Sequence, residues 1–542
     1  MADIQEKIIK LVPDAVFEEG EVLTVCVADK NWHELAKHLK EDTELNFDHL
    51  VAIVGMDWTD TLGTMNYLES TKTGQMLCVK LQTADRDNAM LHSVSDLWDV
   101  ANFYEREVYD YLGVIFINHP DMRRLFLRND WVGYPLRKDY DASPETNPVR
   151  LDHEQSDDST VCYREQPDGT VKKEEVTVFE PNDFVVNIGP QHPATHGVLR
   201  FRTAVDGETI KKIDIYLGYI HRGIEKLSES LGYPQTLHFT DRLDYLSAHQ
   251  NRHCLCLCIE KALGVEVPQR AQVVRVIMDE LMRISSHLLF VGTFCMDLGA
   301  TTMLFYAMRE RETILNIFEK TCGARMTFNY NCIGGVIADL DKDFVHDVKA
   351  LLEIMPKALK EYDTIFTGNV IAKNRMEGVG VLTREDAISY GVTGPAGRAS
   401  GWGCDVRKTH PYGAYAQVEF DEVVRTEGDS MARFKVRMDE IRQSLRIIEQ
   451  LIDRIPEGEI CAKVPKIIKL PEGHWFQQVE ASRGAFGVYI ESRGANTPWR
   501  LKFNSPCMNM AGVVPHIAKG GKIADLITIG GTLDYVVPDI DR

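Results

Sequence analysis

A nearly unbroken apolar stretch from Leu288 to Met308 constrains the fold of this chain most, because a run of this length either crosses a membrane or fills a protein core. Asp297 stands in its middle, where a charge inside a bilayer costs about 2.5–3.5 kcal/mol. Gly292, Gly299 and a pair of threonines also interrupt the run. We therefore predict two buried helices joined by a turn at Asp297, no membrane-spanning segment, and at most a peripheral role at a membrane.

The first part of the chain has the pattern of a small α+β domain. Residues 1–150 contain the β-branched runs VLTVCV, LVAIVGM and MLCVKLQT, each bounded by polar residues, which predict strands. The stretch SDLWDVANFYEREVYDYLG predicts an amphipathic helix that Gly113 closes. Residues 151–183 are rich in acidic side chains, with Gly, Pro and Ser interspersed, which predicts a linker.

Residues 184–542 have the pattern of a second, mainly helical domain. The strand DFVVNI opens it, and a hairpin turning on Asp206 and Gly207 follows. Long amphipathic stretches such as PQRAQVVRVIMDELMRISSHLLF and DSMARFKVRMDEIRQSLRIIEQLID predict a helical core. From about Gly484 the pattern indicates strands and Gly-rich turns. The chain as a whole is predicted to be α+β, with the second domain helical in its core and stranded at both ends.

Charge and cysteine content exclude several classes of protein. The net charge of -20 argues against a nucleic-acid partner, because neutralising phosphates needs clustered Lys and Arg. The start, MADIQEKIIKLVPDAV, has early acids and no apolar segment of a signal peptide. The twelve cysteines lack the dense pairing of small secreted scaffolds. We therefore expect a reduced, cytosolic environment.

Motifs for a metal cluster or a nucleotide are missing from the sequence. It has no C-x-x-C pair, no GxGxxG that opens a strand–helix unit and no Walker loop. The run CLCLC, Cys254 to Cys258, lies in a helical stretch, where its first and last thiols share a face. Buried structural thiols explain this run better than metal ligands do. We predict that the chain itself binds neither a metal nor a nucleotide.

The loop GPQHPATHG carries two closely spaced histidines, His192 and His196. Pro193 rules out a regular helix there. A loop beside a strand end often displays functional groups, but an imidazole bonded to the backbone would fit the same pattern. The residues alone therefore leave both a polar site and a structural role open.

A series of motifs covers nearly the whole second region: NIGPQHPATHGVLRF, GYIHRGIEKL, RLDYLSA, DELMRISSHLLFVGTFCMDLGA, YAMRERETI, NYNCIGGV, GVGVL, RASGWGCDVRK and the closing DIDR. In these motifs and their order, the region resembles the hydrogenase-related, 49-kDa-type quinone-pocket subunit of respiratory complex I. Separately, Tyr104 to Tyr140 resembles the signature of the 30-kDa-type subunit of the same complex, so the resemblance implies two subunits joined in one polypeptide, as in some bacteria.

The resemblance implies a quinone-reduction site with three catalytic side chains. His196 is the headgroup ligand, Tyr245 its partner across the pocket, and Asp297 the carboxylate paired with the histidine. These residue types suit the chemistry, because an imidazole and a phenol can each hydrogen-bond a carbonyl oxygen and then give up a proton, and a carboxylate fixes the imidazole tautomer. His192 has no headgroup role in this scheme. From the residues alone, Tyr245 could equally be a core tyrosine.

The same resemblance implies partners and a location. Arg222 is placed near the terminal iron–sulfur cluster of the adjacent subunit, and His287 in the redox-linked protonation of that cluster. On the residues alone, Arg222 could be a surface salt-bridge residue and His287 a core histidine. Quinone is the substrate, and the partners are iron–sulfur subunits of the hydrophilic arm and membrane-arm subunits. The expected location is the cytoplasmic face of the bacterial inner membrane, as a peripheral part of a proton-pumping oxidoreductase fed by NADH or another donor.

Two rival functions stay open on the sequence. Nickel–iron hydrogenases, the larger relatives, hold their metal with two C-x-x-C pairs, which both the GPQHPATHG region and the terminal DYVVPDIDR lack here. A hydrogenase-type catalytic subunit is therefore a weak alternative. The other is a structural scaffold of the hydrophilic arm. The C-terminal part of the family pattern is altered here, so no residue after about Glu480 is assigned a role.

Overall fold

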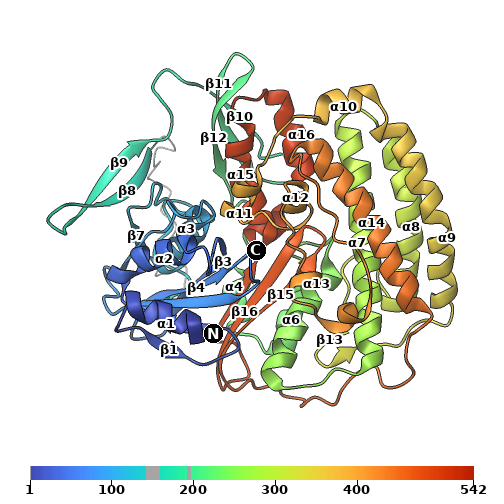
Figure 1. Cartoon of the computed structure of the whole chain (residues 1–542), viewed down its shortest axis with the longest axis horizontal. Helices are drawn as coiled ribbons and strands as arrows, with labels where there is room; N and C mark the ends of the chain where they lie inside the picture. Colours follow the sequence, from blue (N-terminus) through green and yellow to red (C-terminus); the bar gives the residue numbers. More distant parts are fainter. Residues whose placement is uncertain (1, 142–158, 192–196) are drawn as a thin grey trace.

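The computed structural model describes residues 2–141, 159–191 and 197–542 (Figure 1). Its N-terminal part is built on a five-stranded sheet of order β1-β2-β5-β4-β3, in which only β2 and β5 run parallel. The three strands predicted from β-branched runs are confirmed as β2, β3 and β5. The elements are α1 (Ala2–Leu11), β1 (Val16–Glu18), β2 (Leu23–Cys26), α2 (Trp32–Glu41), β3 (His49–Asp57), β4 (Leu62–Glu69), β5 (Met76–Thr83), β6 (Met90–His92), α3 (Ala101–Leu112) and β7 (Ile115–Ile117).

Helix α3 covers the sheet through its contact with β3. It ends as predicted: Gly113 is left-handed, with φ of 72°, and its N–H donates to the carbonyl of Tyr109. Tyr104 of α3 is buried, and its hydroxyl donates to the Val51 carbonyl of β3 at 3.1 Å. The helix is therefore fixed to the sheet by its buried face and by a polar contact.

The segment predicted as a linker contains a β-hairpin. Strand β8 (Ser159–Glu165) pairs with β9 (Val171–Thr177), and the hairpin projects from the body at the left of Figure 1. Strand β8 is attached to the N-terminal part, because Asn118 N–H donates to the Tyr163 carbonyl and Met122 N–H to that of Val161, both at 2.7 Å. Acidic composition alone contains no signal for this pairing. We retain the division of the chain at residues 150 and 183 as a proposal.

The second region begins with an antiparallel sheet, β10-β11-β12, whose predicted hairpin turn is confirmed at Gly207, with φ of 61°. A helical body follows. Its elements are β10 (Phe184–Ile188), β11 (Arg200–Asp206), β12 (Thr209–Tyr216), α4 (Ile224–Ser228), α5 (Tyr233–Thr240), α6 (Ala248–Leu263), α7 (Gln269–Asp297), α8 (Thr302–Cys322), β13 (Asn331–Cys332), β14 (Gly335–Val336), α9 (Phe344–Tyr362), α10 (Val370–Met376), α11 (Arg384–Ser389), α12 (Gly394–Ala399), α13 (Val406–Thr409) and α14 (Ser430–Ile452).

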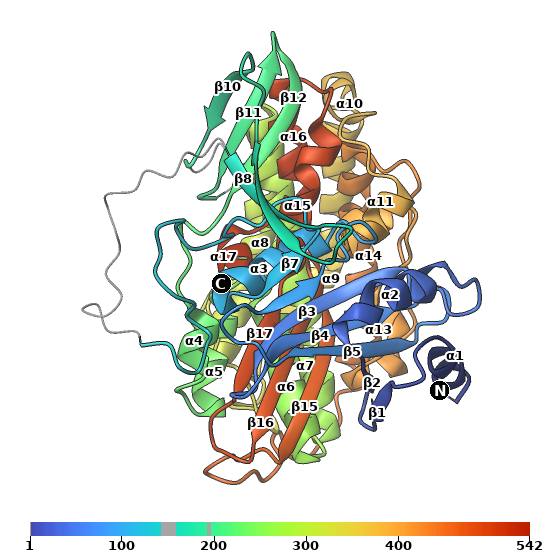
Figure 2. The same ribbon diagram turned by 90° about the vertical axis from the view of Figure 1, so that its left-hand side faces the viewer.

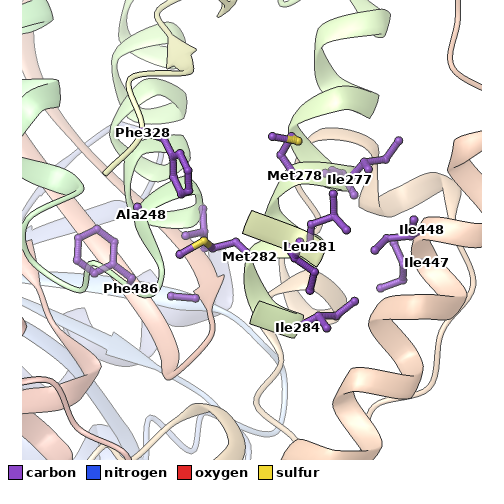
Figure 3. Packing of buried hydrophobic residues seen from close by; sticks show 14 of the residues in the cluster. Ala248, Ile277, Met278, Leu281, Met282, Ile284, Phe328, Ile447, Ile448 and Phe486 are labelled. Atoms are coloured by element: carbon purple, nitrogen blue, oxygen red, sulfur yellow. The ribbon is translucent and has the colours of Figure 1, made fainter. Parts of the chain in front are cut away.

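Helix α7 is the axis of the helical body. It packs against α6, α8 and α14, and Figure 3 shows Leu281 and Ile284 on one of its faces toward Ile447 and Ile448 of α14. The predicted turn between two buried helices is confirmed, because α7 ends at Asp297 and α8 begins shortly beyond it. Among the described residues, no helix combines the length and the apolar character needed to cross a bilayer. The α7 half of the apolar stretch is core, whereas the α8 half is only partly buried, with Phe305 68% exposed.

The C-terminal end corrects one expectation. Strands were predicted from about Gly484 to the end, but they begin earlier, at Glu472, and stop at Asn504, after which the chain is helical. Burial explains the difference: the Gly- and β-branched-rich stretch of α16 has a face packed into the core, and tertiary packing overrides local propensity. The elements are β15 (Glu472–Ala481), β16 (Gly484–Arg493), β17 (Arg500–Asn504), α15 (Pro506–Ala518), α16 (Ile523–Leu533) and α17 (Val537–Asp541).

The N- and C-terminal parts share one apolar core and are joined by buried polar contacts. Strand β17 lies beside β3 (Figure 2), where the Asn504 amide donates to the Val51 carbonyl at 2.9 Å. Glu107 of α3 forms ion pairs with Lys502 at 2.6 Å and with Arg542 at 3.3 Å, and all three side chains are buried. The covalent connection is therefore one of many links between the two parts.

We expect the chain to stay associated and active after a single cut in the 142–158 segment. The shared core and the buried ion pairs at Glu107 join the two parts independently of that connection. The measurement is co-elution of the two fragments after cleavage at an engineered protease site near residue 150. Separation of the fragments at moderate salt would contradict the prediction.

Candidate functional site

Tyr245 lies in the short connection between α5 and α6, partly buried against the core that both parts share. Burial raises the pKa of its hydroxyl, and the neighbouring carboxylates Asp244 and Asp534 act in the same direction against the guanidinium of Arg483. The phenol therefore stays protonated at neutral pH. It can donate a hydrogen bond, and it can release its proton only to a strong base.

Arg483 is the residue that holds this connection in place. Its guanidinium is buried and donates from Nη1 to Asp244 at 2.9 Å and to the Ser286 hydroxyl at 3.0 Å. From its other side, Nε donates to the Asp534 carbonyl at 2.6 Å and Nη2 to the Asp534 carboxylate at 3.1 Å. One side chain at the start of β16 thus links the Tyr245 connection, helix α7 and the end of α16.

The C-terminal end of the GPQHPATHG loop reaches the same region. His192 and His196 lie outside the described residues, but Gly197 is described and packs against Val537, the first residue of α17. A Cβ at Gly197 would lie 2.2 Å from a methyl carbon of Val537, so only glycine fits there. Because Val537 follows closely after Asp534, the residue after His196 lies near the Arg483 contacts.

Asp297 is the last residue of α7 and is partly exposed. Ser286, which contacts Arg483, lies on the same helix, so Asp297 stands about 16 Å further along the axis. Arg483 links the connection that carries Tyr245 to Ser286 of α7, and Asp297 ends the same helix, so α7 connects the two positions. The pairing of Asp297 with His196 stays a prediction, since His196 is outside the described residues.

Arg222 lies on the surface beside the Tyr245 connection. Its guanidinium donates to the backbone carbonyl of Arg242 at 2.7 Å, and the Arg242 side chain is half exposed. Burial, together with the charge of Arg242, lowers the pKa of Arg222. The chain just before Arg222 is held by Asp541, which accepts hydrogen bonds from the N–H groups of Gly218 and Ile220. The two arginines therefore form a fixed, positively charged surface close to Tyr245.

His287 lies within the helical core. It is fully buried on α7, and burial lowers its pKa. Its Nε2 lies 3.0 Å from the Glu440 carboxylate, and its Nδ1 has no hydrogen-bond partner among the residues described. Any effect of a neighbouring cluster on His287 would have to act through long-range electrostatics, and its predicted role stays a prediction.

A buried network of charges surrounds His287. The Arg398 guanidinium on α12 contacts Glu440 of α14 at 2.7 Å and Glu480 of β15 at 2.7 Å. Arg398, through its charge, holds the pKa of Glu440 low against the effect of burial. Burial raises the pKa of Glu480 to about 7, although Arg398 opposes this. The network therefore joins three elements, α12, α14 and β15, and Arg483 follows β15 in the chain.

The predicted burial of the CLCLC thiols on a helix is confirmed. Cys254, Cys256 and Cys258 are fully buried on α6, and the first and last of them face carbonyls of β15 and β16. No group of three or more His, Cys, Asp or Glu side chains that could hold a metal ion occurs within the described ranges.

Three contributors to the site were not predicted from the sequence: Arg483, Asp244 and Asp534. Asp244 lies inside the LDY motif, directly before Tyr245, so its position was a usable signal. Arg483 and Asp534 lie after Glu480, where no roles were assigned. Their contacts link residues 51 to 239 positions apart, which no local pattern reveals.

Comparison with protein families agrees with this architecture. Residues 25–146 match the family described as the respiratory-chain NADH dehydrogenase 30 Kd subunit. Residues 297–542 match the family described as the respiratory-chain NADH dehydrogenase 49 Kd subunit. The first match covers the α+β sheet part, and the second covers the chain from the end of α7 to the C-terminus.

Relatives of known name resemble the chain over nearly its whole length. The C/D subunit of the Phocaeicola vulgatus NADH-quinone oxidoreductase is 57% identical over 511 residues, and that of Bacteroides fragilis is 56% identical over 521; each match covers 94% of this chain and 98% of the relative. The D subunit of the Geobacillus kaustophilus enzyme is 46% identical over 365 residues, which are 67% of this chain and all of that protein. The chain therefore belongs to the family of fused C/D subunits of the NADH-quinone oxidoreductase, respiratory complex I.

Proposed function

We propose that this subunit forms the quinone-reduction site of its complex together with an adjacent iron–sulfur subunit. The observation that carries the proposal is the placement of Tyr245, a protonated and partly buried phenol. Arg483 holds the backbone before Tyr245 against helix α7, because its guanidinium donates to both Asp244 and Ser286. The end of the His196 loop lies near the same contacts through Gly197 and Val537. Donors for both carbonyl oxygens of a quinone can therefore meet in this region.

The reaction needs two electrons and two protons for each quinone. The electrons come from the iron–sulfur cluster of the adjacent subunit, and this chain supplies protons and orientation. Tyr245 hydrogen-bonds one carbonyl oxygen through its hydroxyl, and the His196 imidazole the other. A quinone oxygen becomes strongly basic as it gains electrons, so each proton moves to the substrate as negative charge develops there.

The surface formed by Arg222 and Arg242 is proposed to face the iron–sulfur partner. Both guanidiniums are accessible and fixed, and they adjoin the connection that carries Tyr245. Positive charge beside an electron acceptor favours the arrival of electrons and stabilises the reduced form of a nearby cluster. The subunit would then lie on the cytoplasmic face of the bacterial inner membrane, against membrane-arm subunits.

Asp297 is proposed to fix the tautomer of His196 and to stabilise its protonated form. Once His196 gives its proton to the quinone, Asp297 loses a charged partner. We propose that this local change of charge begins the conformational coupling to proton pumping. The position of Asp297 at the junction of α7 and α8 suits this role, because a change there acts on the ends of two long core helices.

Replacing Asp297 with asparagine is expected to slow quinone reduction about 10- to 100-fold. The change removes a charge-assisted hydrogen bond worth about 1.5–3 kcal/mol in the protonated state of His196. The measurement compares NADH:quinone activity with proton pumping in the assembled complex. The internal control is the rate of electron transfer to a soluble artificial acceptor that takes electrons upstream of the quinone site. This rate is expected to stay unchanged.

The same experiment separates the proposal from its rivals. A scaffold of the hydrophilic arm would keep full quinone reductase activity after this change and after His196→Ala. A variant that reduces quinone and pumps protons at normal rates would contradict the role of Asp297. Metal analysis of the purified complex tests the hydrogenase alternative, which requires nickel in this chain.

A further inference from the structure

A tight hairpin, β13–β14, meets a distant loop at the end of the helical body opposite Asp297. Val336 N–H donates to the Ile460 carbonyl at 3.0 Å, and Ala462 N–H donates to the Gly334 carbonyl at 2.9 Å. Gly335 and Cys461 are bridge partners in this short antiparallel contact. The irregular chain between α14 and β15 is therefore attached to the hairpin around Cys461.

Glycine at position 335 allows an unusually close approach. A Cβ there would lie 2.7 Å from the Cα of Cys461 and 2.1 Å from the Ile460 carbonyl oxygen, so a larger residue would push the loop away. Cys332 pairs with Gly335 across the hairpin. Its thiol reaches over the glycine, and the Sγ atoms of Cys332 and Cys461 are 3.9 Å apart.

Cys332 and Cys461 are both partly exposed residues, whereas eight of the twelve cysteines are buried. Cys254 and Cys258 show the contrast, because they are buried and turned toward strand carbonyls. Cys332 and Cys461 are therefore the thiols of this chain that a small oxidant can reach as a pair.

We propose that Cys332 and Cys461 form a reversible disulfide when the protein meets a peroxide. In the first step one thiolate attacks the peroxide, its sulfur is oxidised to sulfenic acid, and the O–O bond breaks with release of one water from hydrogen peroxide. In the second step the other thiol displaces the sulfenic oxygen as a second water, and the S–S bond forms. A dithiol reductant reverses the process by exchange.

Burial, reinforced by the neighbouring Cys461 thiol, raises the pKa of Cys332 to about 12, so its nucleophilic thiolate forms less readily than that of an ordinary cysteine. Gly335 lies between the two cysteines, so bond formation requires a backbone shift as well as an approach of the two sulfurs by about 1.9 Å. The loop around Cys461, in irregular chain between α14 and β15, would have to supply this shift against its two backbone hydrogen bonds to the hairpin.

The bond would join the loop after α14 to the hairpin after α8, two cysteines 129 positions apart in sequence. The hairpin is fixed to α7, because the Arg275 guanidinium donates to the backbone carbonyls of Cys332 at 2.7 Å and of Gly335 at 2.9 Å. Arg275 stands about 33 Å before Asp297 along the same helix. The inference is therefore independent of the proposed quinone site.

The test is differential alkylation of the intact, purified complex before and after exposure to hydrogen peroxide. We expect Cys332 and Cys461 to become resistant to alkylation together, to appear as one disulfide-linked peptide, and to recover after dithiothreitol. In Cys461→Ser, Cys332 is expected to stay open to alkylation after the same treatment. Cys322→Ser is the matched control, because Cys322 is also partly exposed but lies 4.0 Å from His249 rather than from a thiol.

Two results would overturn the proposal. One is peroxide treatment that leaves Cys332 and Cys461 as open to alkylation as Cys322. The other is oxidation of Cys461 to sulfinic acid with Cys332 still free, which would mean that the two sulfurs do not reach bonding distance. Quinone reductase activity is recorded in parallel, and a disulfide formed without change in that activity would still support the inference.

Discussion

Tyr245→Phe is expected to lower the rate of quinone reduction by about 100- to 10,000-fold, the usual range for loss of a positioned proton donor. Phenylalanine keeps the aromatic ring and its packing against the shared core. It removes the hydroxyl, whose pKa burial keeps raised and which is therefore protonated when the quinone arrives. The loss should appear mainly in the turnover number, because the proton is needed as charge develops on the substrate oxygen.

The measurement is NADH:quinone activity of the assembled complex, divided by its activity with a soluble acceptor that takes electrons before the quinone. Tyr390→Phe is the matched control. Tyr390 is also a partly buried tyrosine whose pKa is raised by burial, but it lies at the end of α11 beside His516. A loss of similar size in both variants, or a change in Tyr245→Phe below about twofold, would refute the proton-donor role.

Much of the architecture could be predicted because local patterns and burial agree. The apolar stretch around Asp297 forms two helices and a turn, since the charge, the glycines and the threonines interrupt it where the chain bends. The hairpin at Gly207 and the helix end at Gly113 follow from backbone geometry that glycine adopts at little cost. In each case the signal lies within a few residues.

The rest depended on contacts that no local pattern contains. Helix α16 was expected as strands, because its Gly- and β-branched-rich sequence has strand character until its packed face is known. The hairpin β8–β9 is attached through strand β8 by hydrogen bonds to Asn118 and Met122, so its acidic composition was a poor guide.

The site shows the same division. Tyr245 and Asp297 came from motif resemblance, whereas Arg483 emerged only from the structure, because its partners Asp244 and Asp534 lie 239 and 51 positions away. Its functional consequence is positional: its contacts are all within the protein, and they fix the backbone before Tyr245. The burial of His287, by contrast, agrees with the core position that its apolar helix allowed from the residues alone.

Arg398→Met is expected to destabilise the subunit by about 3–5 kcal/mol, the cost of removing one partner from a buried ion pair. The change leaves Glu440 and Glu480 without the guanidinium that contacts both at 2.7 Å. All three side chains are buried, so water cannot replace the lost charge. Methionine fills similar volume, which isolates the electrostatic loss from that of packing.

The deficit should depend on pH in a definite direction. Burial already raises the pKa of Glu480 to about 7, and Arg398 opposes that rise. Without Arg398 the folded-state pKa increases further above the unfolded value, so the folded state is penalised wherever the unfolded chain is ionised. The penalty grows until pH exceeds the new folded pKa. We therefore expect a larger loss of stability at about pH 8 than at about pH 6.

Arg442→Met is the matched control for this experiment. Arg442, on the same helix as Glu440, bridges Asp363 at 2.7 Å and Asp439 at 2.8 Å, but its side chain is 39% exposed. Exposed pairs contribute about 0–1 kcal/mol, so its loss should be small and nearly independent of pH. The readouts are the urea midpoint of the purified complex and the amount of subunit that assembles. Equal effects in both variants would mean that the buried network contributes no more to stability than a surface pair. Adding Glu440→Gln and Glu480→Gln to Arg398→Met should recover part of the lost stability, because the carboxylates left unpaired cause that loss.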